Sequence, residues 1–250
     1  SEIVWTVTVD GKTFTRITPT VQDTGQTDYD VDQKDVNWGQ NNNVLYYGKV
    51  SSFRNPDFFA WSRPQKISAS GGGVPDTLTV DGTCNFVERT AISPSGNKMV
   101  GARGLCDAGT EYTSFVYDLV NDTQEELMPG YDAWGARALW WNERWVLTDA
   151  NALWDLDRNG TFESEGHGIL LRELATDYVG AIHPPMAGAD TYDLFDSFAM
   201  SPDGYTLVFC YSSAVYGDNL YAIDPTVDNP ESTRRQLTTD GRSCRVAWAD

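Results

Sequence analysis

The stretch FAMSPDGYTLVF, residues 198–209, decides the fold of this 250-residue chain. A short alternating run of apolar residues leads into Ser201-Pro202-Asp203-Gly204, and a second alternating run follows. Alternation predicts half-buried strands, and Pro, Asp and Gly form turns, so the stretch predicts a β-hairpin. One hairpin does not define a fold, so the next question is whether the pattern recurs.

The hairpin recurs along the chain at a spacing of about 50 residues. Related first hairpins occupy residues 35–49, 89–103 and 138–150, and residues 245–250 repeat a first strand alone. A second hairpin pattern recurs at residues 3–18, 58–68, 114–128, 152–174 and 219–238. Internal repeats of this length are typical of propellers and solenoids.

The repeated unit is therefore two hairpins, or four antiparallel strands. One such sheet cannot bury both of its faces, but sheets packed around an axis bury both and close a ring. We predict an all-β fold, a β-propeller of four-stranded antiparallel blades, as a single domain over residues 1–250. We expect five blades, with the two ends of the chain meeting in one blade, because an open edge promotes aggregation. If the ends do not meet, the chain belongs to a ring of six or more blades.

The motifs of the last repeat resemble the TolB-type, WD40-like propeller repeat, which reads roughly W-S-P-D-G, I-A-F, I-Y-x-x-D and x-x-L-T. The matching segments are Ser201–Gly204, Leu207–Phe209, Leu220–Asp224 and Gln236–Thr238, and Trp5–Asp10 with Arg16–Thr18 match the second half. Other repeats depart from it, since Asn41–Asn43 replace one turn and the Asn142-Glu143 turn lacks Pro and Gly. The resemblance covers nearly the whole chain. It implies a rigid interaction platform, and the catalytic domain that some members carry is not recognised here.

The segment DLDRNGTFE, residues 155–163, has the spacing of a calcium-binding loop. Calcium takes six to eight oxygen ligands, and oxygen side chains at alternate positions of a short loop can enclose it. The predicted ligands are Asp155, Asp157, Asn159, Glu163 and the backbone carbonyl of Thr161, with Glu165 in reserve. The pattern resembles the D-x-D-x-D-G-x-x-D loops of integrin-type propellers, although Asn159 and Glu163 depart from it. An ordinary Asp-Asn-Gly turn is the alternative interpretation.

Four cysteines predict two disulfide bonds. No C-x-x-C pair is present, which excludes the zinc-ribbon and thioredoxin patterns. Cys84 precedes a predicted hairpin and Cys106 follows it, so the hairpin brings the two together, and Cys210 pairs with Cys244 by elimination. Two disulfides indicate an oxidising compartment, periplasmic or extracellular. Four unrelated buried thiols are the alternative.

Two further sets of residues suggest other chemistry. His167 and His183, the two histidines of the chain, form a possible second metal site, although no H-x-H or i, i+4 spacing supports it. The acidic residues Asp28, Asp30, Asp32 and Asp35 are candidates for a glycosidase carboxylate pair, and a solvated acidic loop is the simpler interpretation.

The charge of the chain excludes two classes of partner. With 36 acidic and 18 basic residues, the net charge is −18. Nucleic acids and anionic membrane surfaces attract basic proteins, so neither is an expected partner. The sequence also has no run of about 18 apolar residues, so we predict no transmembrane segment.

Taken together, these patterns predict a non-catalytic scaffold, exported from the cytoplasm and carrying a structural Ca²⁺. Its partner is a protein or a larger assembly. One alternative is a carbohydrate-active hydrolase with acidic loops at the propeller channel. A second alternative is a periplasmic metal-binding protein that uses the two histidines.

Overall fold

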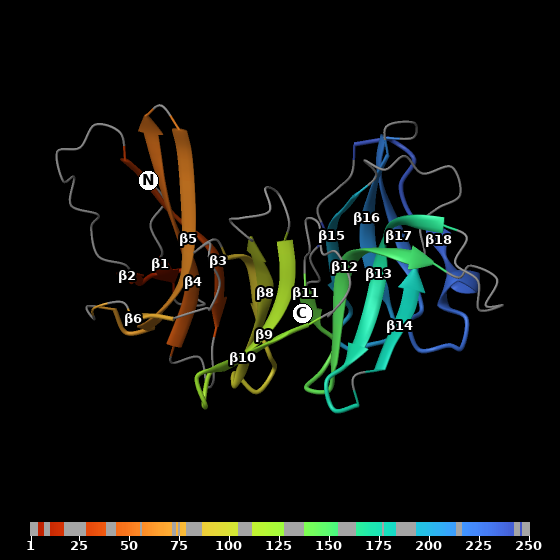
Figure 1. The fold of residues 1–250 in the computed structure, drawn as a ribbon, viewed down its shortest axis with the longest axis horizontal. Coiled ribbons are helices and arrows are strands. Elements are labelled where there is room, and N and C mark those ends of the chain that lie inside the picture. Colours follow the sequence, from red (N-terminus) through yellow and green to blue (C-terminus); the bar gives the residue numbers. More distant parts are fainter. Residues whose placement is uncertain are drawn as a thin grey trace. The chain divides into compact units, whose positions relative to one another are not determined.

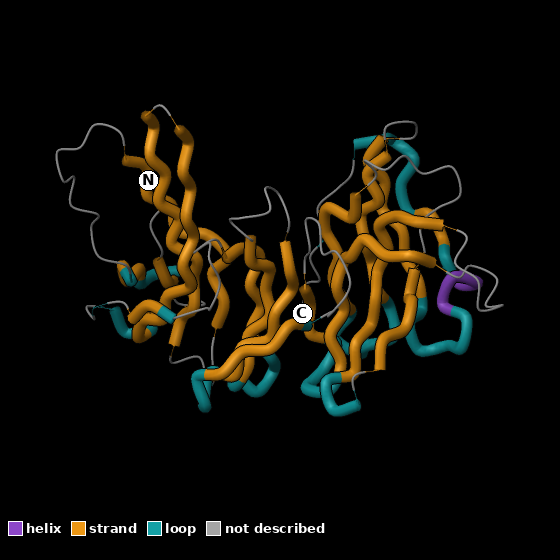
Figure 2. Tube along the Cα trace, in the orientation of Figure 1, coloured by secondary structure: helices purple, strands orange, loops and turns teal. Residues whose placement is uncertain are grey.

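A computed structural model describes most of the strands of the chain. The described residues are 5–7, 11–17, 29–38, 44–55, 57–71, 74, 76–78, 87–104, 112–127, 138–154, 164–176, 178–183, 194–213, 217–242 and 246. The chain divides into two compact units, Ser1–Leu127 and Met128–Asp250. Strands make up nearly all of the regular structure in both units, as Figure 2 shows.

The first unit contains two four-stranded antiparallel sheets and one two-stranded sheet (Figure 1). The two-stranded sheet pairs β1 (Trp5–Val7) with β2 (Phe14–Arg16). The next sheet has the order β3 (Tyr29–Trp38), β4 (Val44–Asn55), β5 (Asp57–Ser68), β6 (Asp76–Thr77). The third has the order β7 (Val87–Ile92), β8 (Lys98–Gly104), β9 (Tyr112–Asp118), β10 (Thr123–Glu126).

The second unit contains two more four-stranded antiparallel sheets. One has the order β11 (Ala138–Trp140), β12 (Trp145–Trp154), β13 (Ser164–Glu173), β14 (Tyr178–His183). The other has the order β15 (Leu194–Met200), β16 (Leu207–Ser213), β17 (Gly217–Ile223), β18 (Arg235–Gln236). The short 3-10 helix η3 (Pro230–Thr233) lies in the connection from β17 to β18. The four-stranded unit predicted from the sequence is thus confirmed.

The two sheets of the second unit pack face to face. Their shared core contains Leu147, Ile169, Leu171 and Ile182 from the first sheet and Leu207, Phe209, Tyr211, Tyr221 and Ile223 from the second. The rings of Phe209 and Tyr221 stack with centroids 5.8 Å apart. Each large apolar side chain buried in this way stabilises the fold by about 1.5–3 kcal/mol, so the interface between the sheets is a major source of stability.

The sheets of the first unit also pack against their neighbours. Leu78, just after β6, contacts a cluster formed by Met99, Phe115 and Tyr117 on β8 and β9. Ile17, just after β2, packs with Ile67 of β5. The core of this unit therefore also lies between sheets, as blade packing requires.

The Ser-Pro-x-Gly turns use the same hydrogen bonds in both units. The Gly204 N–H donates to the Ser201 carbonyl (2.9 Å), and the Gly96 N–H donates to the Ser93 carbonyl (2.8 Å). The side-chain oxygen of each serine accepts a backbone N–H five residues later, from Thr206 in one turn and Lys98 in the other. Both glycines have positive φ, which an L-residue adopts at a cost. The repeated tetrapeptide therefore encodes a repeated turn.

Two aspartates stabilise turns in their ionised form. Backbone and side-chain hydrogen bonds from Asn121, with a further bond from the Val120 N–H, lower the pKa of Asp118. The Ser201 hydroxyl and the Tyr205 N–H lower the pKa of Asp203. Such hydrogen bonds stabilise the turn at neutral pH, and the stabilisation is lost as pH falls through the lowered pKa.

The structure differs from the sequence-based prediction in three places. β12 is one continuous strand through Ala150, where we expected two strands. β6 and β14, the fourth strands of their sheets, were not predicted. Asp30, Asp32 and Asp35 lie within β3, so the prediction of an acidic loop there is wrong. Pairing with β4 holds this polar segment extended, which its composition alone did not indicate.

Two predictions fall partly outside the described residues. Only Val246 is described within residues 245–250, so the meeting of the chain ends in one blade stays a prediction, as does the single-domain organisation. In the part of the chain that is described, no helix is long and apolar enough to cross a membrane.

Gly204→Ala tests the turn that defines the repeat. A Cβ at Gly204 would lie 2.9 Å from Nε1 of Trp141, a side chain that packs against the core of the second unit. We expect the substitution to lower the free energy of unfolding by about 2–3 kcal/mol, from positive φ and crowding together. Urea denaturation followed by circular dichroism measures the loss.

Gly11→Ala is the matched control for this substitution. Gly11 has nearly the same φ, +70° against +77°, but no heavy atom lies within 4 Å of its added Cβ. The control should cost about 1 kcal/mol, from backbone strain alone. Equal losses for the two substitutions would show that Trp141 does not restrict the turn.

Candidate functional site

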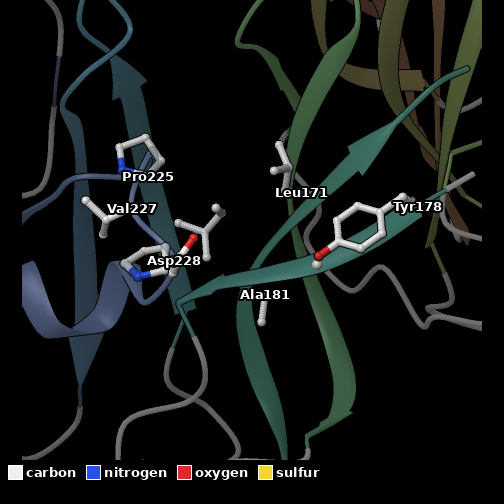
Figure 3. A pocket seen from close by; sticks show the side chains of 9 residues that line it. Leu171, Tyr178, Ala181, Pro225, Val227 and Asp228 are labelled. Atoms are coloured by element: carbon white, nitrogen blue, oxygen red, sulfur yellow. The ribbon is translucent and has the colours of Figure 1, made fainter. Parts of the chain in front are cut away.

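In the second unit, a groove lies between strand β14 and the connection from β17 to η3. It has a volume of about 560 Å³ and is lined by Leu171, Tyr178, Gly180, Ala181, Ile182, Pro225, Val227, Asp228 and Pro230. Figure 3 shows Pro225, Val227 and Asp228 on one side and Leu171, Tyr178 and Ala181 on the other. Asp228 is the single charged side chain among these lining residues. The groove is thus open to solvent, with mostly uncharged lining residues and an exposed surface of both polar and apolar atoms.

The β14 side of the groove is held by a chain of contacts. The ring of Tyr178 packs edge-to-face on Trp145, with centroids 6.1 Å apart. The Arg144 guanidinium lies over the Trp145 ring, 5.5 Å from its centroid. Arg144 also forms an ion pair with the buried Glu173. Glu173 in turn pairs with Tyr178 across β13 and β14 and accepts a hydrogen bond from Thr176. Tyr178 is therefore positioned before any ligand arrives.

The opposite side of the groove is fixed by hydrogen bonds of the β17–η3 connection. The Thr233 hydroxyl donates to the Pro230 carbonyl (2.7 Å) and accepts from the Asp224 N–H (2.8 Å). The Asp224 carboxylate accepts bonds from the N–H and hydroxyl of Thr226. These bonds close the connection at both of its ends. A fixed wall lowers the entropy lost when a ligand binds.

The predicted calcium loop connects two paired strands. Asp155, Asp157, Asn159, Thr161 and Glu163 lie outside the described residues, but Trp154 pairs with Ser164 where β12 and β13 meet the loop. The hairpin predicted over residues 152–174 is thus confirmed, with this segment between its two strands. The ligation itself stays a prediction.

The histidines are brought closer than their sequence spacing suggests. His183 of β14 pairs with Ile169 of β13, and His167 lies two residues before Ile169 on that strand. Their backbone positions are therefore neighbours on adjacent strands. The second metal site stays a prediction, because the structure gives no side-chain position for either residue.

Of the four cysteines, only Cys210 is described. It is fully buried in β16, where it pairs with Leu220 of β17. Cys84, Cys106 and Cys244 lie outside the described residues. Of the hydrolase candidates, Asp28 also lies outside them, and the side chains of Asp30, Asp32 and Asp35 are not described.

Comparison with solved structures agrees with this arrangement of sheets. TolB from Acinetobacter baumannii superposes with a TM-score of 0.56 at 12% identity, covering 94% of this chain and 48% of that one. The fold is a TolB-like β-propeller. No protein-family model and no curated protein matches the sequence.

Peptidase structures share the same fold with this chain. A structure from a study of prolyl endopeptidases gives a TM-score of 0.56 at 16% identity, covering 89% of this chain and 32% of that one. The acylaminoacyl peptidase of Pyrococcus horikoshii gives 0.53 at 12% identity, covering 84% and 33%. The chain thus spans about half of the TolB structure and about a third of the peptidases. At these identities the likeness concerns the fold alone.

The sequence analysis missed the groove because its walls come from distant segments. Tyr178–Ile182 and Pro225–Pro230 are separated by most of a repeat, and neither carries a catalytic motif. The one available signal was Tyr178-Val179-Gly180-Ala181-Ile182, an uncharged segment between two predicted blades. Its small residues weaken the alternation by which strands are recognised.

Proposed function

We propose that this chain is a non-catalytic propeller scaffold that binds a protein partner. The observation that carries the proposal is the groove, which combines an exposed tyrosine with walls fixed by ring packing and hydrogen bonds. Tyr178 is 56% exposed and Val227 is 37% exposed, although both are large apolar side chains. Exposed aromatic side chains in fixed positions are typical anchors of protein interfaces. A scaffold that presents such a groove on rigid sheets needs no chemistry of its own.

We further propose that residues 155–163 bind a structural Ca²⁺. The pairing of Trp154 with Ser164 supports this, because Asp155 directly follows β12 and Glu163 directly precedes β13 in the sequence. Their carboxylates would repel one another without a cation. A bound Ca²⁺ would offset that repulsion and hold the long connection in one conformation.

We also propose two disulfides, Cys84–Cys106 and Cys210–Cys244, and hence an exported protein. Val87 pairs with Arg103, and the same register continued by three residues on each strand would set Cys84 opposite Cys106. For the second bond, Asp218 of β17 forms a bridge with Arg242, two residues before Cys244. Cys210 carries no free thiol, which agrees with the proposal.

Affinity capture tests the scaffold function. The tagged chain is incubated with native extract of the producing organism, and retained proteins are quantified with and without excess untagged chain. We expect one protein to be retained in about 1:1 ratio, to be displaced by the untagged chain, and to co-elute in size-exclusion chromatography.

An activity assay on the same preparation tests the competing hydrolase interpretation. The chain is incubated with a panel of polysaccharides, and reducing ends are measured. A scaffold releases none and retains a partner. Release of sugar together with no competed partner would reject the scaffold proposal.

Calcium is tested by thermal unfolding in excess Ca²⁺ and in EDTA. Free Ca²⁺ at 100 times its Kd stabilises by about 2.7 kcal/mol, which raises Tm by roughly 5–10 °C for a chain of this size. We expect this shift in the unmodified chain and in Glu143→Gln, an exposed control, but not in Asp157→Asn. The same Tm with and without EDTA in the unmodified chain contradicts the site.

Thiol titration of the denatured chain tests the disulfides. In the unmodified chain we expect no reactive thiol before reduction and four afterwards. In Cys84→Ser we expect one reactive thiol before reduction, that of Cys106. Closing a loop of about 20 residues stabilises by about 3 kcal/mol, so Cys84→Ser should lower unfolding stability by that amount. Four reactive thiols without reductant exclude the bonds, and peptide mapping assigns the pairing.

A further inference from the structure

The fourth strands of the four-stranded sheets differ in length and charge. β6 and β18 have two residues each, and β10 has four. These three strands carry Asp76, Arg235 and the pair Glu125 and Glu126. β14 has six residues, and its sequence YVGAIH contains no Asp, Glu, Lys or Arg. Short length and charge protect sheet edges from pairing with other chains, and β14 has neither protection.

The groove runs along this unprotected edge. β14 is the last strand in the order β11-β12-β13-β14, so one of its sides has no strand partner within its sheet. Successive residues of a strand point to opposite faces, yet Gly180, Ala181 and Ile182 all line the groove. The groove therefore meets the edge of the strand as well as one face. Ala181 is exposed, and the Tyr178 ring lies against one face of Gly180.

The facing wall is suited to receive a strand. Pro225 and Pro230 carry no N–H, so they leave fewer donors to compete for hydrogen bonds in the groove. Val227 and Tyr178 account for two of the large apolar side chains that are exposed in the described part of the chain. They lie on opposite sides of the groove and offer contacts to alternate side chains of an extended segment.

Charge indicates the composition of the occupant. Asp228 is the charged side chain of the lining, and Arg144 near the β14 wall is already paired with Glu173. The whole chain carries a net charge of −18, which attracts cationic segments and repels acidic ones. A second copy of this chain would bring the same negative charge, so a basic partner is favoured over self-association.

We propose that the groove binds an extended segment of a partner protein, with alternating apolar and basic residues, which adds to β14 as a further strand. Main-chain hydrogen bonds to the β14 edge would supply affinity, while Tyr178, Val227 and Asp228 would select the side chains. The inference rests on the proposed scaffold function and names the surface and partner chemistry that this function uses.

Peptide binding tests the proposal directly. The probe is a fluorescein-labelled (Val-Lys)₄ peptide, compared by anisotropy at about 150 mM salt with (Val-Glu)₄ and with Val₄Lys₄, which has the same charge without alternation. We expect (Val-Lys)₄ to bind at least tenfold more tightly than either. A form N-methylated at alternate residues should lose binding, because it cannot form strand hydrogen bonds. Hydrogen exchange should show the peptide protecting amides within residues 179–182.

Matched variants locate the binding site. Ala181 is exposed, so Ala181→Lys should fold normally while placing a charge on the edge, and it should weaken binding at least tenfold. Tyr178→Ser should weaken binding about fivefold, whereas Tyr205→Ser removes a tyrosine of similar exposure, 61%, and should leave binding within twofold. Asp228→Lys should weaken binding of (Val-Lys)₄, and Glu125→Lys should not. Unfolding curves confirm that each variant is folded.

The remaining outcomes overturn the proposal or separate it from the scaffold function. Unchanged binding by Ala181→Lys and Tyr178→Ser, or protection of other amides only, overturns it. Dimerisation that protects residues 179–182 without peptide would identify a second copy as the occupant and also overturn it. If the chain and Ala181→Lys capture the same partner equally from extract, the groove proposal fails and the scaffold function stands. If neither captures a partner, the scaffold function fails.

Discussion

Burial of both faces of the central strands is the constraint on which this structure depends. In β16, five consecutive residues from Leu207 to Tyr211 are buried, although successive side chains point to opposite faces. A sheet with this pattern needs a neighbour on each side. The second unit shows one such neighbour directly, in the core shared by its two sheets. Residues 99–102 of β8 and 146–149 of β12 are buried in the same way, and this repetition favours a propeller over a two-layer sandwich.

Central strands whose side chains are buried on both faces cannot contact a partner, so partner binding uses the outer strands and the connections. Those elements contribute single residues to the cores, such as Ile182 of β14, and they vary in length and composition. The short β6 and β18 and the acidic β10 are edges that discourage further pairing. β14, next to the fixed β17–η3 connection, is different, and this difference within one chain distinguishes a binding edge from a protected one.

The sequence predicted the repeat because the turns carry local information. Ser201-Pro202-Asp203-Gly204 and Ser93-Pro94-Ser95-Gly96 form the same hydrogen bonds, and these depend only on residues within each turn. The start of β3, residues 29–34, was missed because its many polar residues resemble a loop, and its extended conformation depends on pairing with β4. β14 was missed for a related reason, since Gly180 and Ala181 weaken its alternation.

The candidate site was less accessible to sequence reasoning than the fold. A groove is a relation between two segments, and no local pattern marks the place where Tyr178 faces Pro225 and Val227. The predictions of a calcium loop and of two cysteine pairs are of a different kind, because each rests on spacing along the chain. Surface recognition depends on which side chains are left uncovered, and tertiary packing decides that.

The contact between Tyr178 and Trp145 joins the outermost strand of a sheet to the start of its second strand. Trp145 also ends the tight turn in which the Asn142 side chain accepts hydrogen bonds from two backbone N–H groups. Any event that immobilises the tyrosine would therefore be transmitted to the indole beside it. The fluorescence of Trp145 should therefore change when the outer strand β14 becomes immobilised.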